Sequence, residues 1–292
     1  MPPTDHYIQQ LHKHYPQLPI DTVTLNQNGQ YNDVLLINDE LVFRFAKVPD
    51  AIKTLHHEVT ILRSIQNQVS LAVPNPIYEN VVTNVVGEAF VGYAKIAGEP
   101  LWVEAFEAIT TPEAKKRLAV QLAEFLRELH SIPIQTLLSD QLPLMDTRSE
   151  WVDLYEQIQD KLFTYMRPDA RRQVANHFEH FLDTPQLHDF EPTLRHGDFG
   201  PGNILFDPAQ LSITGIIDFG GVNLGDPAVD FAALYSSYGE AVYQQCAAIY
   251  PAMVAALPRV HFYRGTFALQ EALFGIENGD GTAFHNGIAN YL

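Results

Sequence analysis

The sequence predicts an α+β fold with two lobes, in which a smaller strand-rich part precedes a larger helix-rich part. The apolar runs 34–37 and 41–45 are joined by Asn38-Asp39-Glu40, a tripeptide typical of a turn between strands. Beyond Gly98 the apolar residues recur at intervals of three and four, as they do along the buried face of a helix. A chain of 292 residues is long enough for two lobes. Strands that come first and helices that follow are typical of the α+β class.

Residues 1–96 are predicted to form the smaller lobe. Its clearest helix has an apolar residue every three or four positions between Ile52 and Ile65. Val73-Pro74-Asn75-Pro76 is expected to end this stretch, because proline cannot continue a helix. The expected elements, in order, are a helix over 5–15, strands within 21–47, a helix over 51–67, and strands over 77–86 and 88–96.

Residues 97–292 are predicted to form the larger lobe, with the joint between the lobes near Ala94 to Gly98. Thr111 followed by Pro112 is a typical helix start, since proline fits the first helical position. A short strand–loop–strand segment is expected to interrupt the helices near residue 200. The expected helices are one that begins at Thr111 and others over 149–166, 170–183, 228–256 and 259–276.

The composition indicates a folded chain with an acidic surface. Hydrophobic residues make up 46% of the chain and charged residues 18%, and 18 basic against 35 acidic residues give a formal net charge of −17. Such a surface repels nucleic acid and anionic lipid, so neither is expected as a partner. It would attract a cationic small molecule, although acidity that serves only solubility explains the same charge. The sequence leaves the oligomeric state open.

The sequence favours a cytoplasmic location. Cys246 is the only cysteine, so an internal disulfide cannot form, which fits reducing conditions. The first residues lack the basic start and apolar core of a signal peptide. No run approaches the 18 apolar residues of a membrane span, so no membrane partner is expected.

Three polar side chains carry the chemistry of the predicted site. Asp198 and Asn203 stand five positions apart in a glycine-rich turn, and Asp218 follows the strand-like run 213–217. A carboxylate can orient a hydroxyl group and take its proton, while an amide oxygen and a second carboxylate suit Mg²⁺. The layout therefore predicts phosphoryl transfer to a hydroxyl, with Asp198 as the base and Asn203 and Asp218 as metal ligands. Taken singly, each residue could instead cap a turn.

The run from His196 to Asn203, HGDFGPGN, followed by Asp218-Phe219-Gly220, resembles the phosphotransferase branch of the protein-kinase-like superfamily. The resemblance implies a protein-kinase-like fold in which residues 1–96 bind ATP or GTP, and residues 97–292 carry catalysis and substrate binding. Gly197 stands where protein kinases carry an arginine that can pair with an activation-loop phosphate. Only eleven residues lie between Asp218 and Asp230, which leaves no room for a long activation segment and favours a small-molecule kinase.

Two residues are expected to support the catalytic loop. Gly225-Asp226-Pro227 and Asp230 extend the resemblance to the aminoglycoside and choline kinase group. This likeness implies that Asp230 braces the loop from behind, although Asp230 could also serve the start of the helix after Pro227. His196 is expected to be a packed, hydrogen-bonded residue.

Arg44 stands where these kinases typically place a strand lysine against the nucleotide phosphates. The resemblance assigns it that role ahead of Lys47, which strand alternation would place on the opposite face. Glu58 is the expected ion-pair partner of Arg44, with a solvated surface glutamate as the alternative. Gly29, in the loop 27–33, resembles part of a phosphate-covering loop, but a hairpin turn explains this loop better when it is taken alone.

The run from Tyr93 to Gly98 resembles the hinge of these kinases, which implies that backbone groups of Ala94 and Ile96 bind the purine. Together with segments such as 128–132, it looks like the aminoglycoside 2″-phosphotransferases. That likeness implies an aminoglycoside substrate. The candidate substrate residues are Glu240, Phe267 and Glu271, with a core position as the alternative for Phe267.

We therefore expect a small-molecule kinase that uses Mg²⁺ and ATP or GTP, with an aminoglycoside as the leading acceptor. A macrolide, choline, homoserine or a sugar is the alternative acceptor for the same chemistry. The alternative from another class is a nucleotide-binding pseudokinase that acts as an interaction module. Arg44 in place of lysine supports that alternative, whereas Asp198, Asn203 and Asp218 oppose it.

Overall fold

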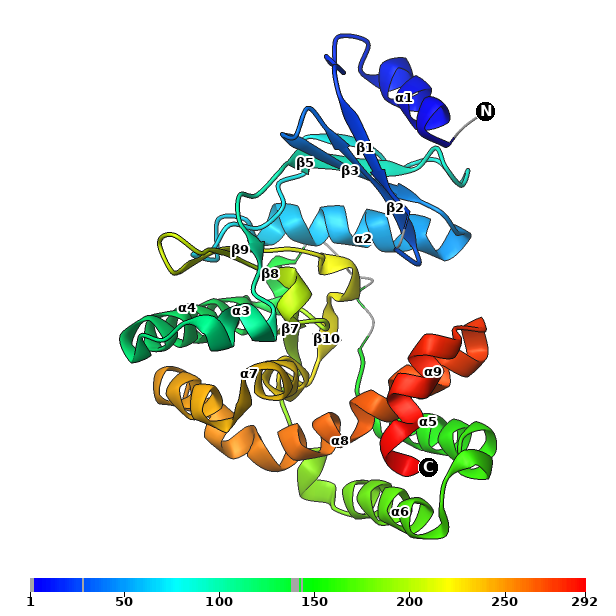
Figure 1. Cartoon of the computed structure of the whole chain (residues 1–292), viewed down its shortest axis with the longest axis vertical. Coiled ribbons are helices and arrows are strands. Elements are labelled where there is room, and N and C mark those ends of the chain that lie inside the picture. Colours follow the sequence, from blue (N-terminus) through cyan, green and yellow to red (C-terminus); the bar gives the residue numbers. More distant parts are fainter. Residues whose placement is uncertain (1–2, 28, 138–141, 143) are drawn as a thin grey trace. The chain divides into compact units, whose positions relative to one another are not determined.

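The structure is a computed structural model that describes residues 3–27, 29–137, 142 and 144–292 (Figure 1). Its contacts divide the chain into two compact units. The first comprises residues 1–142 with 201–222, and the second comprises residues 143–200 with 223–292. The segment 196–230 therefore contributes to both units.

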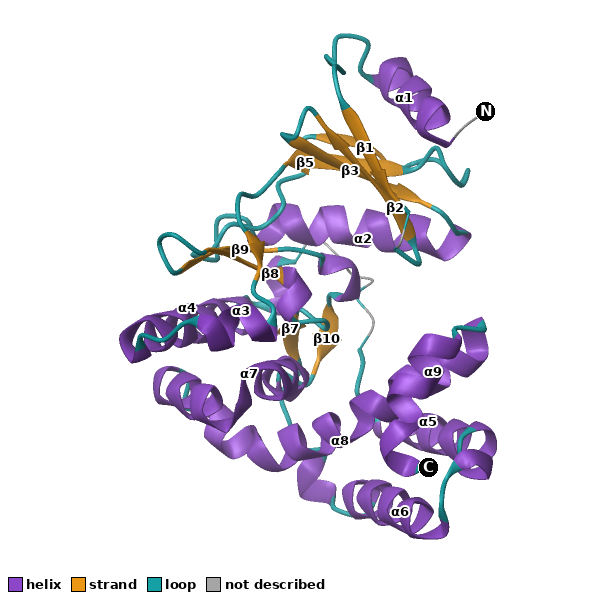
Figure 2. Cartoon of the chain, viewed as in Figure 1, coloured by secondary structure: helices purple, strands orange, loops and turns teal. Residues whose placement is uncertain are grey.

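The first unit is built on a five-stranded antiparallel sheet with the order β1-β2-β3-β5-β4 (Figure 2). Asn38 and Asp39, between β2 and β3, have φ values of 53° and 55°, which suit the two central positions of a tight hairpin turn. The strands are β1 (Val23–Asn26), β2 (Asn32–Ile37), β3 (Leu41–Ala46), β4 (Tyr78–Asn80) and β5 (Phe90–Ala94).

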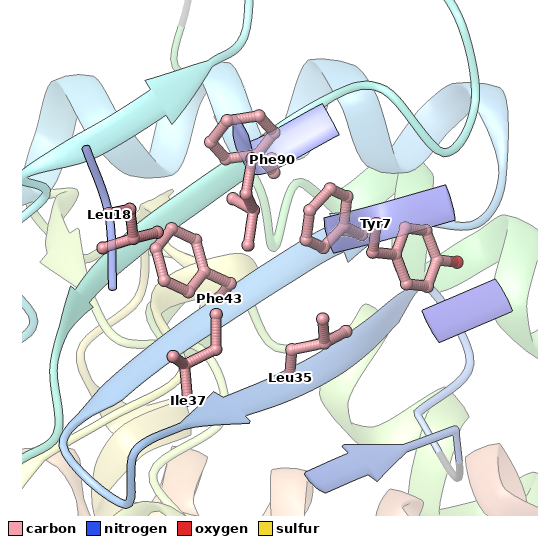
Figure 3. Packing of buried hydrophobic residues seen from close by; sticks show 8 residues of the cluster. Tyr7, Leu18, Leu35, Ile37, Phe43 and Phe90 are labelled. Carbon is pink, nitrogen blue, oxygen red and sulfur yellow. The ribbon is translucent and has the colours of Figure 1, made fainter. Parts of the chain in front are cut away.

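Each face of this sheet is covered by a helix (Figure 1). α1 (Pro3–His14) packs on one face, where Tyr7, Leu35, Phe43 and Phe90 belong to one buried cluster (Figure 3). α2 (Pro49–Ile65) packs on the other face through a second buried cluster that includes Leu55. Both clusters exclude water from the apolar side chains of the strands, which stabilises the sheet.

The alternation of side chains along β3 determines which of the two helices Arg44 faces. Phe43 and Phe45 both lie in the α1 cluster, and Arg44 stands between them in β3. Because successive side chains of a strand point to opposite faces, Arg44 lies on the face that α2 covers. This brings Arg44 to the helix that carries Glu58.

The rest of the first unit carries two further predicted site residues. A hairpin of two strands in the sheet β6-β8-β9 begins directly after Asn203 and ends two residues before Asp218. The Gln121 side chain accepts a hydrogen bond from the Ile213 N–H at 3.0 Å and thereby ties this hairpin to α4. The elements are β6 (Glu99–Pro100), α3 (Val103–Ala108), α4 (Pro112–His130), β8 (Ile204–Asp207) and β9 (Ser212–Ile216).

The second unit is mainly helical. Its two short strands pair antiparallel, and β7 runs directly into His196 while β10 runs into Asp226. α7 bends at Gly239, whose φ of 81° a residue with a side chain rarely adopts. The elements are α5 (Arg148–Lys161), α6 (Pro168–Leu182), β7 (Thr193–Arg195), β10 (Asn223–Gly225), α7 (Ala228–Ile249), α8 (Ala252–Asn278) and α9 (Gly281–Ile288).

The predicted α+β class is confirmed, and the differences concern element ends and two helices. The helix expected over 228–256 ends at Ile249, and α8 begins just after Pro251. α8 then runs through Pro258, so the break expected between 256 and 259 is absent. The strand expected over 77–86 is limited to Tyr78–Asn80. The helices α3 and α9 were not predicted. The division of nucleotide binding and catalysis between residues 1–96 and 97–292 stays a prediction.

Across the residues that the structure describes, none of the helices combines the length and the apolar character that crossing a membrane demands.

Candidate active site

Arg44 lies buried in the first unit between two carboxylates. Its Nη1 donates a hydrogen bond to Glu58 Oε1 at 2.5 Å, and its Nη2 donates to Asp218 Oδ1 at 2.9 Å. A planar guanidinium can hold both carboxylates at once because its N–H groups point in fixed, different directions.

The pair of Arg44 and Glu58 is a buried pair of charges. Burial would lower the pKa of the Arg44 guanidinium, but the attraction of Glu58 and Asp218 raises that pKa above its usual value. Burial raises the pKa of the Glu58 carboxyl, and the attraction of Arg44 offsets only part of this effect. Glu58 is therefore a fully buried partner of Arg44 and does not lie solvated on the surface. Loss of either partner would leave the other as an uncompensated buried charge.

The β8–β9 hairpin brings Asn203 and Asp218 to the same end of the first unit. The Ile217 N–H donates to the Asn203 carbonyl oxygen at 2.9 Å, directly beside Asp218. Asp218 has a φ of 63°, which is uncommon for a residue with a side chain, and its side chain remains 48% exposed. The backbone thus holds the exposed Asp218 carboxylate beside the backbone segment that carries Asn203.

A cavity of about 270 Å³ lies beside Arg44 in the same unit. Arg44 and Asp218 form its polar end, and Ile96 belongs to its wall. Ala94 is exposed at the end of β5. The remaining wall is mostly apolar, formed by Val34, Val42, Tyr93, Leu205 and Ile217, among others.

Lys47 binds the loop that carries Gly29 and does not bind Glu58. Its Nζ donates to the carbonyl oxygens of Gln27 and Gly29, both at 3.0 Å, and pairs with Asp33 at 3.2 Å. A Cβ on Gly29 would come within 2.6 Å of the Asn32 carbonyl oxygen, so only glycine fits this loop without a shift. The structure therefore gives Arg44 and Lys47 separate partners.

In the second unit, Asp230 holds the loop that carries Asp198. The Asp230 side chain lies in the first turn of α7 and is fully buried. Its Oδ2 accepts from the His196 N–H at 2.8 Å, and its Oδ1 accepts from the Gly197 N–H at 2.9 Å. His196 is buried too, and its Nδ1 accepts from the Asp198 N–H at 3.3 Å. Two buried side chains thus bind three consecutive backbone N–H groups that end at Asp198.

Asp198 lines a cavity of about 530 Å³ in the second unit. Of the three candidate substrate residues, Phe267 lies in the wall of this cavity. Glu240 is exposed on α7 just after Gly239, and Glu271 is exposed on α8, where its neighbour Gln270 lines the cavity instead.

The cavity wall also contains charged residues that sequence reasoning missed, namely Asp146, Glu150 and Arg195. Thr147 and Glu150 form a capping box at the start of α5, in which each side chain binds the backbone N–H of the other. The sequence predicts a helix from residue 149, and the spacing of threonine and glutamate is a further local signal of this helix start. This spacing does not indicate that the start of α5 lies in the wall of the cavity that contains Asp198.

Asp146 is held by one ion pair and one hydrogen bond. Arg195 Nη2 lies 3.3 Å from Asp146 Oδ2, and the Asp226 N–H donates to the same oxygen at 3.0 Å. Arg195 uses its Nε to donate to Asn223 Oδ1 at 2.7 Å. Burial raises the pKa of the Asp146 carboxyl to about 6, although Arg195 acts in the opposite direction.

The residues that could hold a divalent cation are the oxygen donors Asn203 and Asp218 in the first unit. Among the described residues there is no group of three or more His, Cys, Asp or Glu side chains that could enclose a metal ion. Magnesium keeps several waters and takes oxygen ligands from phosphates, so one carboxylate and one amide fit such a cation.

Three comparisons with known proteins show the family and the fold of this chain. The model of the phosphotransferase enzyme family matches residues 22–263. Viomycin phosphotransferase from Streptomyces vinaceus is 28% identical over 94% of this chain and 95% of its own length. The structure of the GDP and kanamycin complex of APH(2″)-IIIa is 28% identical, with a TM-score of 0.89 over 98% of this chain and 96% of that one. The gentamicin complex of APH(2″)-IIa, at 22% identity, has a TM-score of 0.78 over 97% and 93% of the two chains and supports the fold alone. The protein-kinase-like fold and the likeness to aminoglycoside 2″-phosphotransferases are thereby confirmed.

Substitution of Arg44 by lysine tests the double ion pair. We expect Arg44→Lys to lower the free energy of unfolding by ~1–3 kcal/mol, because lysine keeps the charge but not the planar fork that binds Glu58 and Asp218 together. Urea denaturation measures the change. Arg117→Lys, on the exposed face of α4, is the matched control and should change the value by less than ~0.5 kcal/mol. Equal stability of the two variants would contradict the double pair.

The raised pKa of Asp146 predicts a pH dependence. Because the folded protein holds this proton up to about pH 6 and the unfolded chain releases it near the ordinary value of 3.8, the group stabilises the fold at low pH. That contribution is lost as the pH rises through 6. The free energy of unfolding of the wild type minus that of Asp146→Asn should therefore fall by ~2 kcal/mol between pH 4 and 7. Chemical denaturation at four pH values measures this difference, with Asp153→Asn on the exposed side of α5 as the control. A difference that does not vary with pH would refute the shift.

Proposed function

Because the chain belongs to the phosphotransferase enzyme family, we propose that it is a small-molecule kinase that transfers the γ-phosphoryl group of a magnesium-bound nucleotide to a hydroxyl group. One observation carries the proposal. Asp198 lines a cavity large enough for a small molecule, on a loop whose backbone is fixed by Asp230.

Asp198 is the proposed catalytic base. Its carboxylate would accept a hydrogen bond from the acceptor hydroxyl and take the proton as the oxygen attacks the γ-phosphorus. The bond from that phosphorus to the β–γ bridging oxygen breaks, and the nucleoside diphosphate leaves. His196 and Asp230 contribute by fixing the backbone on both sides of this carboxylate and are positioning residues.

The first unit is proposed to bind the nucleotide. The apolar wall of its cavity suits a purine ring, with backbone groups of Ala94 and Ile96 at the purine edge. Arg44, positioned by Glu58, would bind the phosphates, and the loop with Gly29 would cover them. The GDP complex of APH(2″)-IIIa makes GTP the first nucleotide to test beside ATP. Residues 1–96 are thus proposed to form most of the nucleotide site, with Leu205, Ile217 and Asp218 completing its wall, and residues 97–292 are proposed to carry catalysis, in a reaction that takes place in the cytoplasm.

Asn203 and Asp218 are the proposed magnesium ligands. Their oxygen donors fit a hard cation, and the exposed fraction of the Asp218 side chain leaves room for a ligand. When bound, the cation would neutralise charge that develops on the phosphate oxygens. Five positions separate Asn203 from Asp198, so the covalent chain keeps their Cα atoms within ~18 Å of each other.

The leading acceptor is an aminoglycoside, and the second candidate is viomycin. Kanamycin is present in the complex of APH(2″)-IIIa, which is 28% identical to this chain. Viomycin phosphotransferase has the same identity over nearly its whole length and favours the second candidate. Three carboxylates in the wall of the Asp198 cavity suit amine-bearing acceptors of both kinds.

A turnover screen tests the proposed function. Kanamycin, gentamicin, streptomycin, viomycin and a macrolide are offered with ATP and with GTP in the presence of Mg²⁺, and release of the nucleoside diphosphate is measured. We expect acceptor-dependent release with at least one aminoglycoside or with viomycin, and a phosphorylated product by mass spectrometry. Nucleotide binding without acceptor-dependent release across the whole panel would favour a pseudokinase that acts as an interaction module.

A further inference from the structure

The loop with Gly29 is joined to α1, a helix that precedes the part of the chain matched by the family model. That model begins at residue 22, whereas α1 covers Pro3–His14. Tyr7 of α1 packs in the buried cluster against the sheet, and its ring stacks on that of Phe45 at a centroid distance of 4.3 Å (Figure 3). The Tyr7 hydroxyl donates a hydrogen bond to Asp33 Oδ2 at 2.7 Å. α1 thereby binds the last residue of the loop 27–33.

Asp33 lies on the face of the sheet that α1 covers. It stands opposite Phe45 in the pairing of β2 with β3, and residues directly opposite each other share a face. Asp33 is buried, its Oδ2 also accepts from Gln27 Nε2 at 3.1 Å, and Lys47 Nζ lies 3.2 Å from its Oδ1. Burial would raise the pKa of the Asp33 carboxyl, but the hydrogen bonds of Tyr7 and Gln27 and the charge of Lys47 hold that pKa below its usual value. Asp33 is therefore a buried anion whose charge Lys47 balances.

Lys47 holds the loop at several points along its length. Its ammonium group carries three N–H donors and is surrounded by three oxygens, namely the carbonyl oxygens of Gln27 and Gly29, both at 3.0 Å, and Asp33 Oδ1 at 3.2 Å. The Lys47 backbone N–H donates to the Tyr31 carbonyl oxygen at 2.8 Å. These contacts engage the donors of Lys47, so its side chain acts on the loop and not directly on a phosphate.

These contacts lie on the two strands that also form the wall of the first unit's cavity. Val34 and Arg44 stand opposite each other in the pairing of β2 with β3, and both line that cavity. Asp33 directly precedes Val34, and Lys47 follows Arg44 by three positions, so the alternation of side chains turns both away from the face of Arg44. The sheet therefore presents the cavity on one face and anchors the loop from the other.

We propose that Tyr7, Asp33 and Lys47 form a clamp that holds the loop with Gly29 ready to cover the phosphates of the nucleotide, so that α1 sets the affinity for a nucleoside triphosphate. This inference rests on the proposed function, in which this loop covers the phosphates. The three are positioning residues, because Tyr7 acts through Asp33, Asp33 through Lys47, and Lys47 through the loop. A loop that is held before the nucleotide arrives loses less freedom on binding, and this preorganisation strengthens binding.

Tyr7→Phe separates the clamp from the packing of α1. Phenylalanine keeps the ring that stacks on Phe45 and removes only the hydroxyl that donates to Asp33. Tyr15→Phe is the matched control, because Tyr15 directly follows α1 and packs against the same cluster. Its hydroxyl donates to the Glu79 carbonyl oxygen at 3.2 Å and accepts from the Glu79 N–H at 2.8 Å, so it binds β4 instead of the loop.

Magnesium-bound GTP and ATP are the probes, with GMP and AMP as reference ligands that lack the β- and γ-phosphates. Calorimetry on the full chain measures the Kd of each. For the triphosphate that the wild type binds more tightly, we expect Tyr7→Phe to raise the Kd about fivefold, because the loop loses part of its support. The Kd of the matching monophosphate should change by less than about 1.5-fold, and Tyr15→Phe should match the wild type for both ligands.

Variants of Lys47 test the same clamp at its other end. Lys47→Met should raise the Kd of the triphosphate about tenfold, whereas Lys47→Arg keeps a cation beside Asp33 and should raise it less than about threefold. Adding Tyr7→Phe to Lys47→Met should produce no further increase, because both residues act through one clamp. If Lys47→Met does not fold, Tyr7→Phe alone decides the outcome.

Two sets of results separate the clamp from the proposed function. Unchanged triphosphate affinity in Tyr7→Phe, or an equal loss in Tyr15→Phe or for the monophosphate, would overturn the inference and leave the proposed function standing. Weaker triphosphate binding confined to Tyr7→Phe, in a protein whose wild type phosphorylates no acceptor, would refute the proposed function and leave the clamp standing.

Discussion

The two hydrogen bonds that the Asp230 carboxylate accepts fix the loop on which the proposed chemistry depends. The loop places the backbone N–H of His196 in the interior and that of Gly197 in a partly buried position, and each buried N–H that loses its partner costs ~1–3 kcal/mol. A single buried carboxylate satisfies both groups at 2.8 and 2.9 Å. The position of Asp198 is therefore set by a residue 32 positions later in the chain, at the start of α7.

The same rule, that buried charges need partners, organises both units. In the first unit, Arg44 pairs with Glu58 and with Asp218, and the alternation of side chains along β3 brings Arg44 to this side of the sheet. In the second unit, Asp226 is fully buried and accepts from Arg259 at 2.6 Å and from the Tyr263 hydroxyl at 2.8 Å. Such pairs cost desolvation energy, so they define one arrangement of the polar groups rather than adding much net stability.

Features that repeat locally could be predicted from the sequence, and features made by distant contacts could not. The signal for α2 is an apolar stripe that repeats within a few positions, and the signal for the β2–β3 turn is the adjacent pair Asn38 and Asp39. The spacing of Asp198 and Asn203 is likewise short. The contact of Asp146 with Arg195 joins residues 49 positions apart and has no local period, so the charged wall of the cavity was missed. The expected strand over 77–86 failed for a related reason, because the pairing of β4 with β5, and not its run of apolar residues, limits it to three residues.

The central claim is that the Asp198 carboxylate takes the acceptor proton during phosphoryl transfer. The most direct measurement compares kcat and nucleotide affinity in the wild type and in Asp198→Asn, which preserves the size of the side chain and removes its basicity. The account predicts that kcat falls by about 10²–10⁴-fold while the Kd for the magnesium nucleotide stays within about threefold. An Asp198→Asn variant with the kcat of the wild type would contradict it.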